Sequence, residues 1–384
     1  MCRDRDHQRH PLLCIVPPHI LQHLAQLRDP KLRALAENAL RAIALSERLR
    51  GERSAIGGIA PLLATSTAGK QRSICDARGG ATLPGAVVRR EGEPPTADAS
   101  VNEAYDGLGS TYDLYSTVYE RDSIDGRGMS LLATVHYRRQ YNNAFWNGRQ
   151  MVFGDGDGKI FQRFTRSVDV IGHELTHGVT QYEAGLEYQG QPGALNEHFS
   201  DVFGSLVKQF ALGQRTDKAD WLIGAGLFAR GIRGVALRSM KAPGTAYDDP
   251  KIGRDPQPAH MDDYVETEDD NGGVHINSGI PNRAFYLAAM GFEGYAWSKA
   301  GMVWYRALTD LLGTASDFED AARVTTEVAG AQFGTAGAEI VRRAWGAVGI
   351  QAAPRTARRK GGGEYADHPG SKRGVRGAAA RSHR

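Results

Sequence analysis

The sequence predicts an α+β fold with two lobes, the first of mixed helix and strand and the second almost entirely helical. Strand-like alternation of apolar residues marks the segments 86–90, 130–137 and 150–153. After residue 168, apolar residues recur at helical intervals instead. These helices are expected at about 193–210, 279–291, 299–312, 316–330 and 335–347. A chain of 384 residues allows two or three domains and a large core.

A separate helical unit precedes the two lobes, at residues 11–53. Pro17–Leu21 opens a short helix, and a second helix is expected from about Pro30 to Leu49. A helical hairpin of this size is marginally stable alone, so we expect it to pack on the rest of the chain. The basic run Arg48–Ser54 and the Gly- and Ala-rich stretch after it predict an exposed processing region.

The first lobe continues with one long helix, expected from Val101 to Glu120, and with a turn in the glycine- and aspartate-rich run 154–158. The three cysteines, Cys2, Cys14 and Cys75, are odd in number, so the sequence predicts no disulfide framework.

The most informative motif is His173-Glu174-Leu175-Thr176-His177. Apolar residues recur at helical spacing through it, which places the motif on a buried amphipathic helix. Two histidines four residues apart project from one face of a helix and can hold one metal ion. The alternative is a surface helix with solvated histidines, but burying these side chains without a metal would be costly.

A second helix carries Glu197 and Asp201 one turn apart. Glu197 is a candidate third ligand, and Asp201 is a candidate acceptor for the free ring N–H of a ligand histidine. Two His and one carboxylate around zinc leave a fourth position open, as in hydrolytic zinc sites. The Gly-rich segment 270–279 adds Asp270 and His275, which are either a solvated pair or an Asp-oriented His that donates to an oxyanion.

Together these segments resemble the thermolysin-like neutral zinc metalloendopeptidases, and within them the protealysin-type subgroup with a short prosegment. The similarity covers about residues 70–350. Besides the zinc helix, the segments that carry it are Asn142–Gly148, Met151–Gly158, Gly193–Glu197, Leu237–Met240 and Asp270–Asn282.

The resemblance implies a two-lobed protease with the zinc helix between the lobes. Its expected parts are a helical inhibitory prosegment (1–53), a β-rich N-terminal lobe that includes the zinc helix (54–184), a helical C-terminal lobe (185–352) and a disordered basic tail (353–384). The segment Pro17–Pro18 resembles the part of such prosegments that lies in the substrate cleft. Cys14 could approach the zinc as a thiolate, although we favour a buried or incidental thiol.

The implied reaction is hydrolysis of internal peptide bonds. One Zn²⁺ per chain is the implied cofactor, with His173, His177 and Glu197 as its ligands. Glu174 would take the proton of a water molecule and deliver it to the leaving amine. Tyr188 and His275, the latter held by Asp270, would donate to the oxyanion.

The resemblance also implies how peptide and protein substrates are held. Asn143 and Ala144 match an edge strand that pairs with substrate backbone, and Arg238 matches an arginine that binds a substrate carbonyl. The residues that match the lining of the side-chain pocket are Phe161, Phe164, Val170, Ile223 and Leu237. We expect preference for a bulky hydrophobic residue just after the cleaved bond.

One departure from the family pattern concerns calcium. Thermolysin binds a pair of calcium ions beside the zinc helix, and only Asp169 and Asp220 match carboxylates of that site. The residues at other carboxylate positions are Lys208, Leu222, Ala225 and Gly226. Because calcium needs six to eight oxygens, we expect the double site to be lost, with Lys208 pairing with Asp169 instead.

The net charge of +3 is unevenly distributed. Residues 353–384 hold nine Lys/Arg against two acidic residues, so the tail is +7 and the rest of the chain is −4. We expect a solvated extension of no chemical role, with nucleic-acid binding as the alternative. No apolar run reaches membrane-spanning length, and the charged start lacks a signal-peptide core. We therefore expect no membrane partner, a monomer, and either non-classical secretion or a cytoplasmic location.

Two other functions stay open. A catalytically silent zinc protein could bind a partner through its retained prosegment. An exopeptidase would need an anchor for a chain terminus, and no motif in the sequence suggests one.

Overall fold

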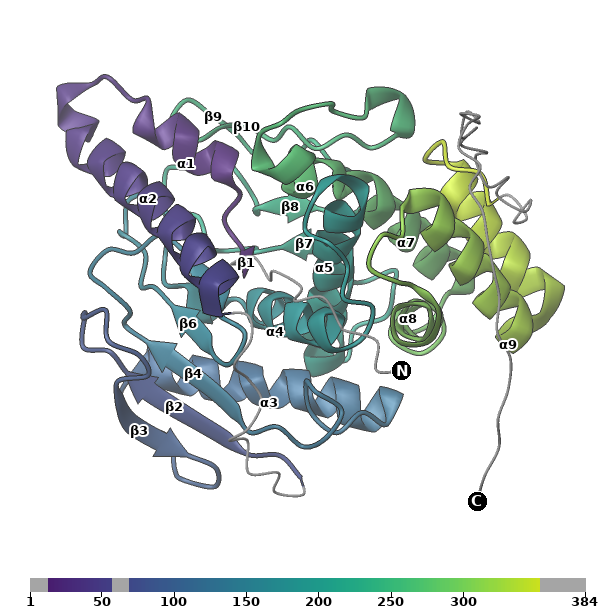
Figure 1. Cartoon of the computed structure of the whole chain (residues 1–384), viewed down its shortest axis with the longest axis horizontal. Helices are drawn as coiled ribbons and strands as arrows, with labels where there is room; N and C mark the ends of the chain where they lie inside the picture. Colours follow the sequence, from purple (N-terminus) through teal and green to yellow (C-terminus); the bar gives the residue numbers. More distant parts are fainter. Residues whose placement is uncertain (1–12, 57–68, 353–384) are drawn as a thin grey trace, which may run out of the picture. The chain divides into compact units, whose positions relative to one another are not determined.

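The computed structural model describes residues 13–56 and 69–352 (Figure 1). The expected basic tail lies outside these ranges, as do residues 57–68 of the expected processing region. Within the described ranges, no helix combines the length and the apolar character needed to cross a membrane.

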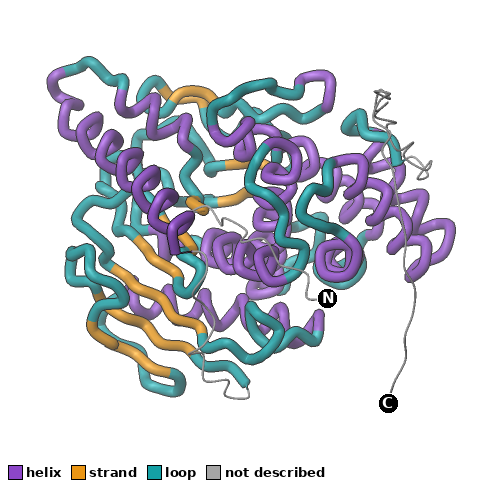
Figure 2. The backbone as a smooth tube through the Cα atoms, in the orientation of Figure 1, coloured by secondary structure: helices purple, strands orange, loops and turns teal. Residues whose placement is uncertain are grey.

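A six-stranded mixed sheet organises the N-terminal part of the fold (Figure 2). In spatial order its strands are β1 (Leu13–Cys14), β5 (Ala144–Trp146), β6 (Met151–Phe153), β4 (Leu131–Val135), β2 (Arg72–Asp76) and β3 (Ala86–Arg90). β2 and β6 run parallel to β4, whereas the other neighbouring pairs are antiparallel. The three expected strand segments are confirmed. β1 comes from the N-terminal helical unit, so a segment of that unit completes the sheet.

The long helix α3 (Ala99–Tyr119) packs on this sheet and on α4 (Val168–Tyr182). It begins at Asp98, whose side chain accepts hydrogen bonds from the N–H groups of Ser100 and Val101. Gly107 lets α3 approach α4 closely, because a Cβ there would lie 2.2 Å from Cδ1 of Ile171.

Helices α4 and α5 (Gly190–Leu212) form the central pair of the fold. Their close approach depends on Gly204 of α5, where a Cβ would lie 2.4 Å from the carbonyl oxygen of Asp169. The same Cβ would lie 3.0 Å from the backbone nitrogen of His173. A glycine at this position therefore brings the polar side chains of α5 within reach of those of α4.

The C-terminal part is helical, as expected. Its elements are α6 (Asp270–Asn277), α7 (Gly279–Phe292), α8 (Ala300–Arg306), the π-helical turn η4 (Ala307–Leu311) and α9 (Phe318–Gly346). The two helices expected at 316–330 and 335–347 are the halves of α9, which Gly334 interrupts with φ 68° and ψ −167°. Short elements complete the chain: β7 (Leu222–Ile223), β8 (Arg238–Ser239), β9 (Asp248–Asp249), β10 (Gly253–Arg254), η2 (Phe164–Arg166) and η3 (Met261–Asp263).

The N-terminal helical unit consists of α1 (Pro18–Ala25), η1 (Pro30–Leu32) and α2 (Arg33–Ile56). As expected, it packs on the rest of the protein: His23 Nε2 lies 3.2 Å from the carbonyl oxygen of Pro250, and Asn38 donates to Gln140 at 3.2 Å. α2 does not end near residue 49. It continues through the run Arg48–Ser54, expected to be part of an exposed processing region; five of its seven residues are Arg, Leu or Glu, which favour helix. The expected boundary at residue 53 therefore falls inside a helix.

Candidate active site

Three polar side chains on one face of α4 are completely buried: His173, Glu174 and His177. The two imidazole rings meet edge to face, with their Nε2 atoms 3.0 Å apart. The spacing of four residues therefore produces the shared face that the sequence predicted.

Polar partners fix the tautomer of both rings. His173 Nδ1 lies 2.8 Å from an Asp201 carboxylate oxygen, and His177 Nδ1 lies 2.8 Å from the Asn196 carbonyl oxygen and 2.9 Å from the Ser200 hydroxyl. Since the Asp and Asn oxygens only accept hydrogen bonds, each Nδ1 carries the proton. In the neutral rings the two Nε2 lone pairs therefore face each other, an arrangement that a cation between them, whether a metal ion or a proton, stabilises.

Glu197 on α5 adds a carboxylate to this arrangement. Its oxygens lie 3.4 Å from His173 Nε2 and 3.5 Å from His177 Nε2. One of them, Oε2, is buried without a hydrogen-bond partner. The ligand atoms of the three residues all lie within 4.8 Å of one another. Two imidazole nitrogens and one carboxylate at this spacing fit an open zinc site.

The charges around the cluster also favour a cation. Burial lowers the pKa of His173, but the carboxylates of Asp201 and Glu197 outweigh it and raise that pKa to about 9. Burial lowers the pKa of His177 to about 3. Burial alone would raise the pKa of Glu197, yet the neighbouring imidazoles, His275 foremost, hold it well below its usual value. The cluster is thus built around a buried anionic carboxylate.

Glu174 lies beside this cluster, and only one of its two carboxylate oxygens accepts a hydrogen bond. Its Oε2 accepts a hydrogen bond from the backbone N–H of Trp146 on β5 at 2.9 Å. Its Oε1 is buried and has no hydrogen-bond partner. Burial raises the pKa of Glu174 to about 8. The geometry therefore leaves Oε1 free to accept a proton from a bound water molecule.

Tyr188 and His275 face the cluster from the C-terminal lobe. The Tyr188 hydroxyl donates a short hydrogen bond to Glu197 and lies 3.3 Å from His275 Nε2. The Asp270 carboxylate holds His275 at two points: one oxygen lies 2.6 Å from the ring Nδ1 of His275, and the other accepts the backbone N–H of His275 at 2.9 Å. Left-handed backbone at residues 270–273 turns the loop back on itself so that both contacts form. The Asp–His pair is buried, which rules out the solvated alternative.

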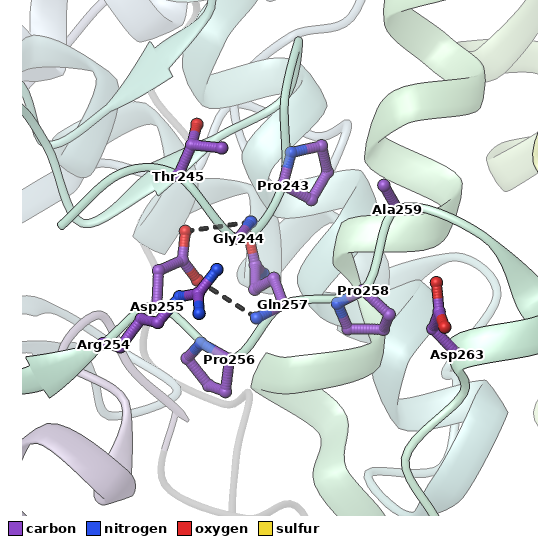
Figure 3. A pocket seen from close by; sticks show the side chains of 10 residues that line it. All are labelled: Pro243, Gly244, Thr245, Arg254, Asp255, Pro256, Gln257, Pro258, Ala259 and Asp263. Atoms are coloured by element: carbon purple, nitrogen blue, oxygen red, sulfur yellow. Dashed lines mark hydrogen bonds between the residues drawn. The ribbon is translucent and has the colours of Figure 1, made fainter. Parts of the chain in front are cut away.

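Gln257 anchors the backbone behind this loop. Its Nε2 donates to the His275 carbonyl at 2.9 Å and to the Ser278 hydroxyl at 3.1 Å. Gln257 also lines an open hollow of about 390 Å³, where Asp255 accepts hydrogen bonds from the backbone N–H groups of Gln257 and Gly244 (Figure 3). None of the ten residues that line this hollow is a candidate catalytic residue or metal ligand, so the hollow lies apart from the cluster.

The N-terminal unit lies directly against the cluster. Strand β1 pairs antiparallel with β5, with Cys14 opposite Phe145. The carbonyl oxygen of Cys14 lies 3.2 Å from His275 Nε2. The group of described residues that could hold a metal ion does not include Cys14. Cys14 therefore meets the site through its peptide carbonyl.

The next two residues continue along β5. Ile15 donates its N–H to the Ala144 carbonyl at 3.3 Å, and its own carbonyl accepts from Arg238 Nη1 at 3.2 Å. Val16 donates its N–H to the Asn143 side-chain oxygen at 3.1 Å. The three residues expected to hold substrate backbone thus all bind backbone of the N-terminal unit.

Pro17 and Pro18 follow immediately and end the run of backbone hydrogen bonds to β5. A proline has no N–H to pair with β5, so Pro17 ends the extended segment and caps α1 instead. The hydrogen bonds that the N-terminal segment makes to the site thus come from residues 14–16, and the expected place of Pro17–Pro18 in the substrate cleft stays a prediction.

The side chains expected to line the substrate pocket are almost completely buried. Phe161 and Phe164 pack with ring centroids 5.6 Å apart, and Ile223 is paired with Arg238 across the β7–β8 ladder. Phe161, Phe164, Val170, Ile223 and Leu237 each have at most 1% of their surface exposed. The side chain of Ile15 is likewise 0% exposed. The pairing of Ile223 with Arg238 brings part of this apolar set next to the arginine that holds the Ile15 carbonyl.

Comparison with known proteins identifies the family. The signature of the thermolysin metallopeptidase catalytic domain matches residues 70–181, and that of its alpha-helical domain matches residues 184–350. An extracellular metalloprotease of Pectobacterium carotovorum is 51% identical over 345 residues, which cover 89% of this chain and 97% of that protein. The protease PrtS of Photorhabdus is 52% identical over 73% of this chain and 76% of its own length. The chain belongs to the thermolysin family.

The solved precursor of protealysin, a metalloproteinase of Serratia proteamaculans, also resembles this protein. The two share 50% sequence identity and a TM-score of 0.80, over 88% of this chain and 99% of that one. This protein is thus a thermolysin-like metalloprotease, with a two-part fold of β-containing and helical domains, and its family is zinc-dependent.

A lysine lies in the region that matches the expected calcium-binding part of thermolysin. Lys208 lies 3.2 Å from Asp169 and 2.8 Å from Asp220, and it also donates to the Leu222 carbonyl at 3.2 Å. The expected Lys208–Asp169 ion pair is confirmed. The ammonium supplies one positive charge between two carboxylates, where calcium would supply two.

Sequence reasoning missed several partners of the site. Asn196 and Ser200 fix His177, Trp146 holds Glu174 through its backbone, and Gln257 anchors His275. The helical spacing of Asn196 and Ser200 beside Glu197 could have indicated the first two. The others are contacts between residues far apart in sequence, and no local pattern signals them.

Proposed function

We propose that this protein is a zinc-dependent endopeptidase made as a self-inhibited precursor. His173, His177 and Glu197 are proposed as the ligands of one Zn²⁺, because their donor atoms converge on a buried anionic position. When bound, the ion supplies a Lewis acid that polarises the scissile carbonyl and makes water acidic.

The remaining steps belong to the protein's own side chains. Glu174 accepts the proton of the attacking water on its unpartnered Oε1 and transfers it to the leaving nitrogen. His275, oriented by Asp270, and Tyr188 donate hydrogen bonds to the oxyanion that forms on the substrate carbonyl. The position of the Cys14 carbonyl at His275 supports this role, since it lies where a scissile carbonyl would lie.

The observation that carries the proposal is the way residues 14–16 bind. An extended segment pairs with the edge strand β5, offers one carbonyl to His275 and the next to Arg238. These are the contacts expected of a substrate, so the same contacts exclude other peptides while the segment stays bound. We therefore propose residues 1 to about 56 as the inhibitory prosegment, extended by three residues from the sequence prediction so that the boundary falls at the end of α2.

Substrate selectivity follows from the same register. Ile15 is the residue just after the carbonyl that faces His275, and its side chain is completely buried. Phe161, Phe164, Val170, Ile223 and Leu237 are proposed to form the pocket that receives it. We propose preference for a bulky hydrophobic residue at this position in substrates, and action outside the cell, as the names of the relatives suggest.

The test is a time course on the purified full-length chain. Zinc content, cleavage of an internally quenched peptide and the mass of the chain are followed together, beside Glu174→Gln. We expect one zinc per chain. We expect loss of the N-terminal segment and rising peptidase activity in the wild type but not in Glu174→Gln. A wild-type chain that binds zinc and loses its N-terminus but cleaves no peptide would refute the proposal and favour the silent zinc protein.

A further inference from the structure

Asp201, the carboxylate that orients His173, is held by more than its arginine. It is fully buried and receives two hydrogen bonds from Arg238, each at 2.8 Å. A further donor comes from α7: the amide nitrogen of Asn282 lies 2.8 Å from Asp201 Oδ2. Asn282 is itself completely buried, so its amide has a fixed set of partners.

Those partners form a chain of hydrogen bonds that leads away from the cluster. The carbonyl oxygen of Asn282 lies 2.8 Å from Nδ1 of His198, the residue next to the proposed ligand Glu197. Trp304 on α8 donates its indole N–H to Nε2 of His198 at 2.8 Å. Like Asn282, His198 and Trp304 are 0% exposed.

The direction of this chain is fixed by its first member. An indole N–H can only donate, so His198 Nε2 accepts and the ring proton is on Nδ1. That N–H donates to the Asn282 oxygen, which turns the amide nitrogen toward Asp201. A flipped amide would instead face the carboxylate with its oxygen, and two acceptors would meet without a proton between them.

We propose that Trp304, His198 and Asn282 are positioning residues for the metal ligand His173 and act through Asp201. This inference rests on the proposed zinc site. A carboxylate held by fixed donors keeps the His173 ring in one orientation, so that its Nε2 lone pair stays aimed at the metal position. Removal of a partner in the shell around a zinc ligand typically weakens metal binding about 10–100-fold, and we expect about 10-fold for this more remote chain.

The core of the C-terminal lobe offers a matched control. The indole of Trp345 stacks on that of Trp304, with ring planes 7° apart and centroids 6.1 Å apart. It donates its N–H to the hydroxyl of Thr325 at 2.9 Å, and that bond does not lead to Asp201. Trp304→Phe and Trp345→Phe therefore each remove one buried indole N–H from a pair of stacked rings. Only Trp304→Phe removes the hydrogen bond to Nε2 of His198.

The experiment measures the zinc dissociation constant of full-length precursors by competition with a chromophoric chelator. We expect about 10-fold weaker binding for Trp304→Phe and His198→Leu. His198→Asn keeps an N–H donor near the Nδ1 position and should bind within about threefold of wild type, as should Trp345→Phe. Thermal unfolding of the metal-free chains separates folding stability from metal affinity.

The inference is overturned if Trp304→Phe and His198→Leu bind zinc as wild type does, or if Trp345→Phe weakens binding as much as Trp304→Phe. A wild-type chain that takes up no zinc would refute the proposed metal site, and this inference with it. Zinc bound equally by all variants would instead leave the proposed function intact and refute the positioning chain alone.

Discussion

The buried side chain of Ile15 determines how firmly the N-terminal segment closes the proposed active site. Its backbone N–H and carbonyl are held by Ala144 and Arg238, and those bonds persist when the side chain is shortened. Ile15→Ala therefore removes apolar packing alone. Truncating a fully buried isoleucine to alanine costs at least about 2 kcal/mol. If that cost falls on the bound state of the segment, the fraction of open precursor rises roughly 30-fold.

The assay is the initial rate of quenched-peptide cleavage by freshly purified precursor, with mass spectrometry to show that the chain is still intact. Leu40→Ala is the matched control, because Leu40 lies on α2 of the same unit and is 55% exposed. We expect a higher initial rate for Ile15→Ala by about the factor above, and no change for Leu40→Ala. An intact Ile15→Ala precursor with the wild-type rate would refute the view that this side chain holds the segment in place.

Three further predictions follow from the contacts described. Burial lowers the pKa of His19 to about 4. His19 lies near Asp270, His275 and Arg238, and its ring forms a hydrogen bond with the Tyr247 hydroxyl. The docked segment thus favours neutral His19, so docking is strongest above the free pKa of about 6.5 and weakens as pH falls toward 4. At pH 5 this shift raises the ratio of open to docked precursor by about 30-fold, or by about 10-fold once solvent screening is allowed for. Peptide cleavage measures this opening, and His19→Phe should abolish its change with pH. Calcium should raise the melting temperature of the wild type by at most a degree or two, and a large saturable rise would contradict the loss of the calcium site. Lys208→Met should lower the free energy of unfolding by about 3 kcal/mol, because it leaves the buried Asp169 carboxylate without its cationic partner. Tyr188→Phe should lower kcat of the processed enzyme by about 10²-fold with little change in KM, and an unchanged kcat would remove Tyr188 from the oxyanion site.

The parts of the site that were predictable from sequence are those set by local periodicity. His173 and His177 share a face because both lie on one helix, and the same reasoning places Glu197 and Asp201 one turn apart on the next helix. The close approach of the two helices was not predictable in this way. It depends on Gly204, whose missing side chain matters only because the backbone of α4 lies 2.4 Å from where a Cβ would be.

The contacts that could not be predicted join residues far apart in the chain. β1 has only two residues, too few to show alternation, and its place in the sheet depends on pairing with a strand more than a hundred residues later. No local pattern distinguishes His198 from the other residues around Glu197, yet its partners lie on α7 and α8. Such bonds arise from tertiary packing, so a single sequence shows neither their existence nor their direction.

Arg238 links the backbone of the N-terminal segment to the orientation of His173. Its Nε and Nη2 are both committed to Asp201, and Nη1 is the nitrogen that reaches the Ile15 carbonyl. A planar guanidinium fixed at two points presents its third donor in a defined direction, which a lysine ammonium does not. The carboxylate that holds His173 thus also aims the donor that holds the bound backbone. Because one rigid group makes both contacts, the Ile15 carbonyl that binds Arg238 is placed in register with His173 without a separate positioning element.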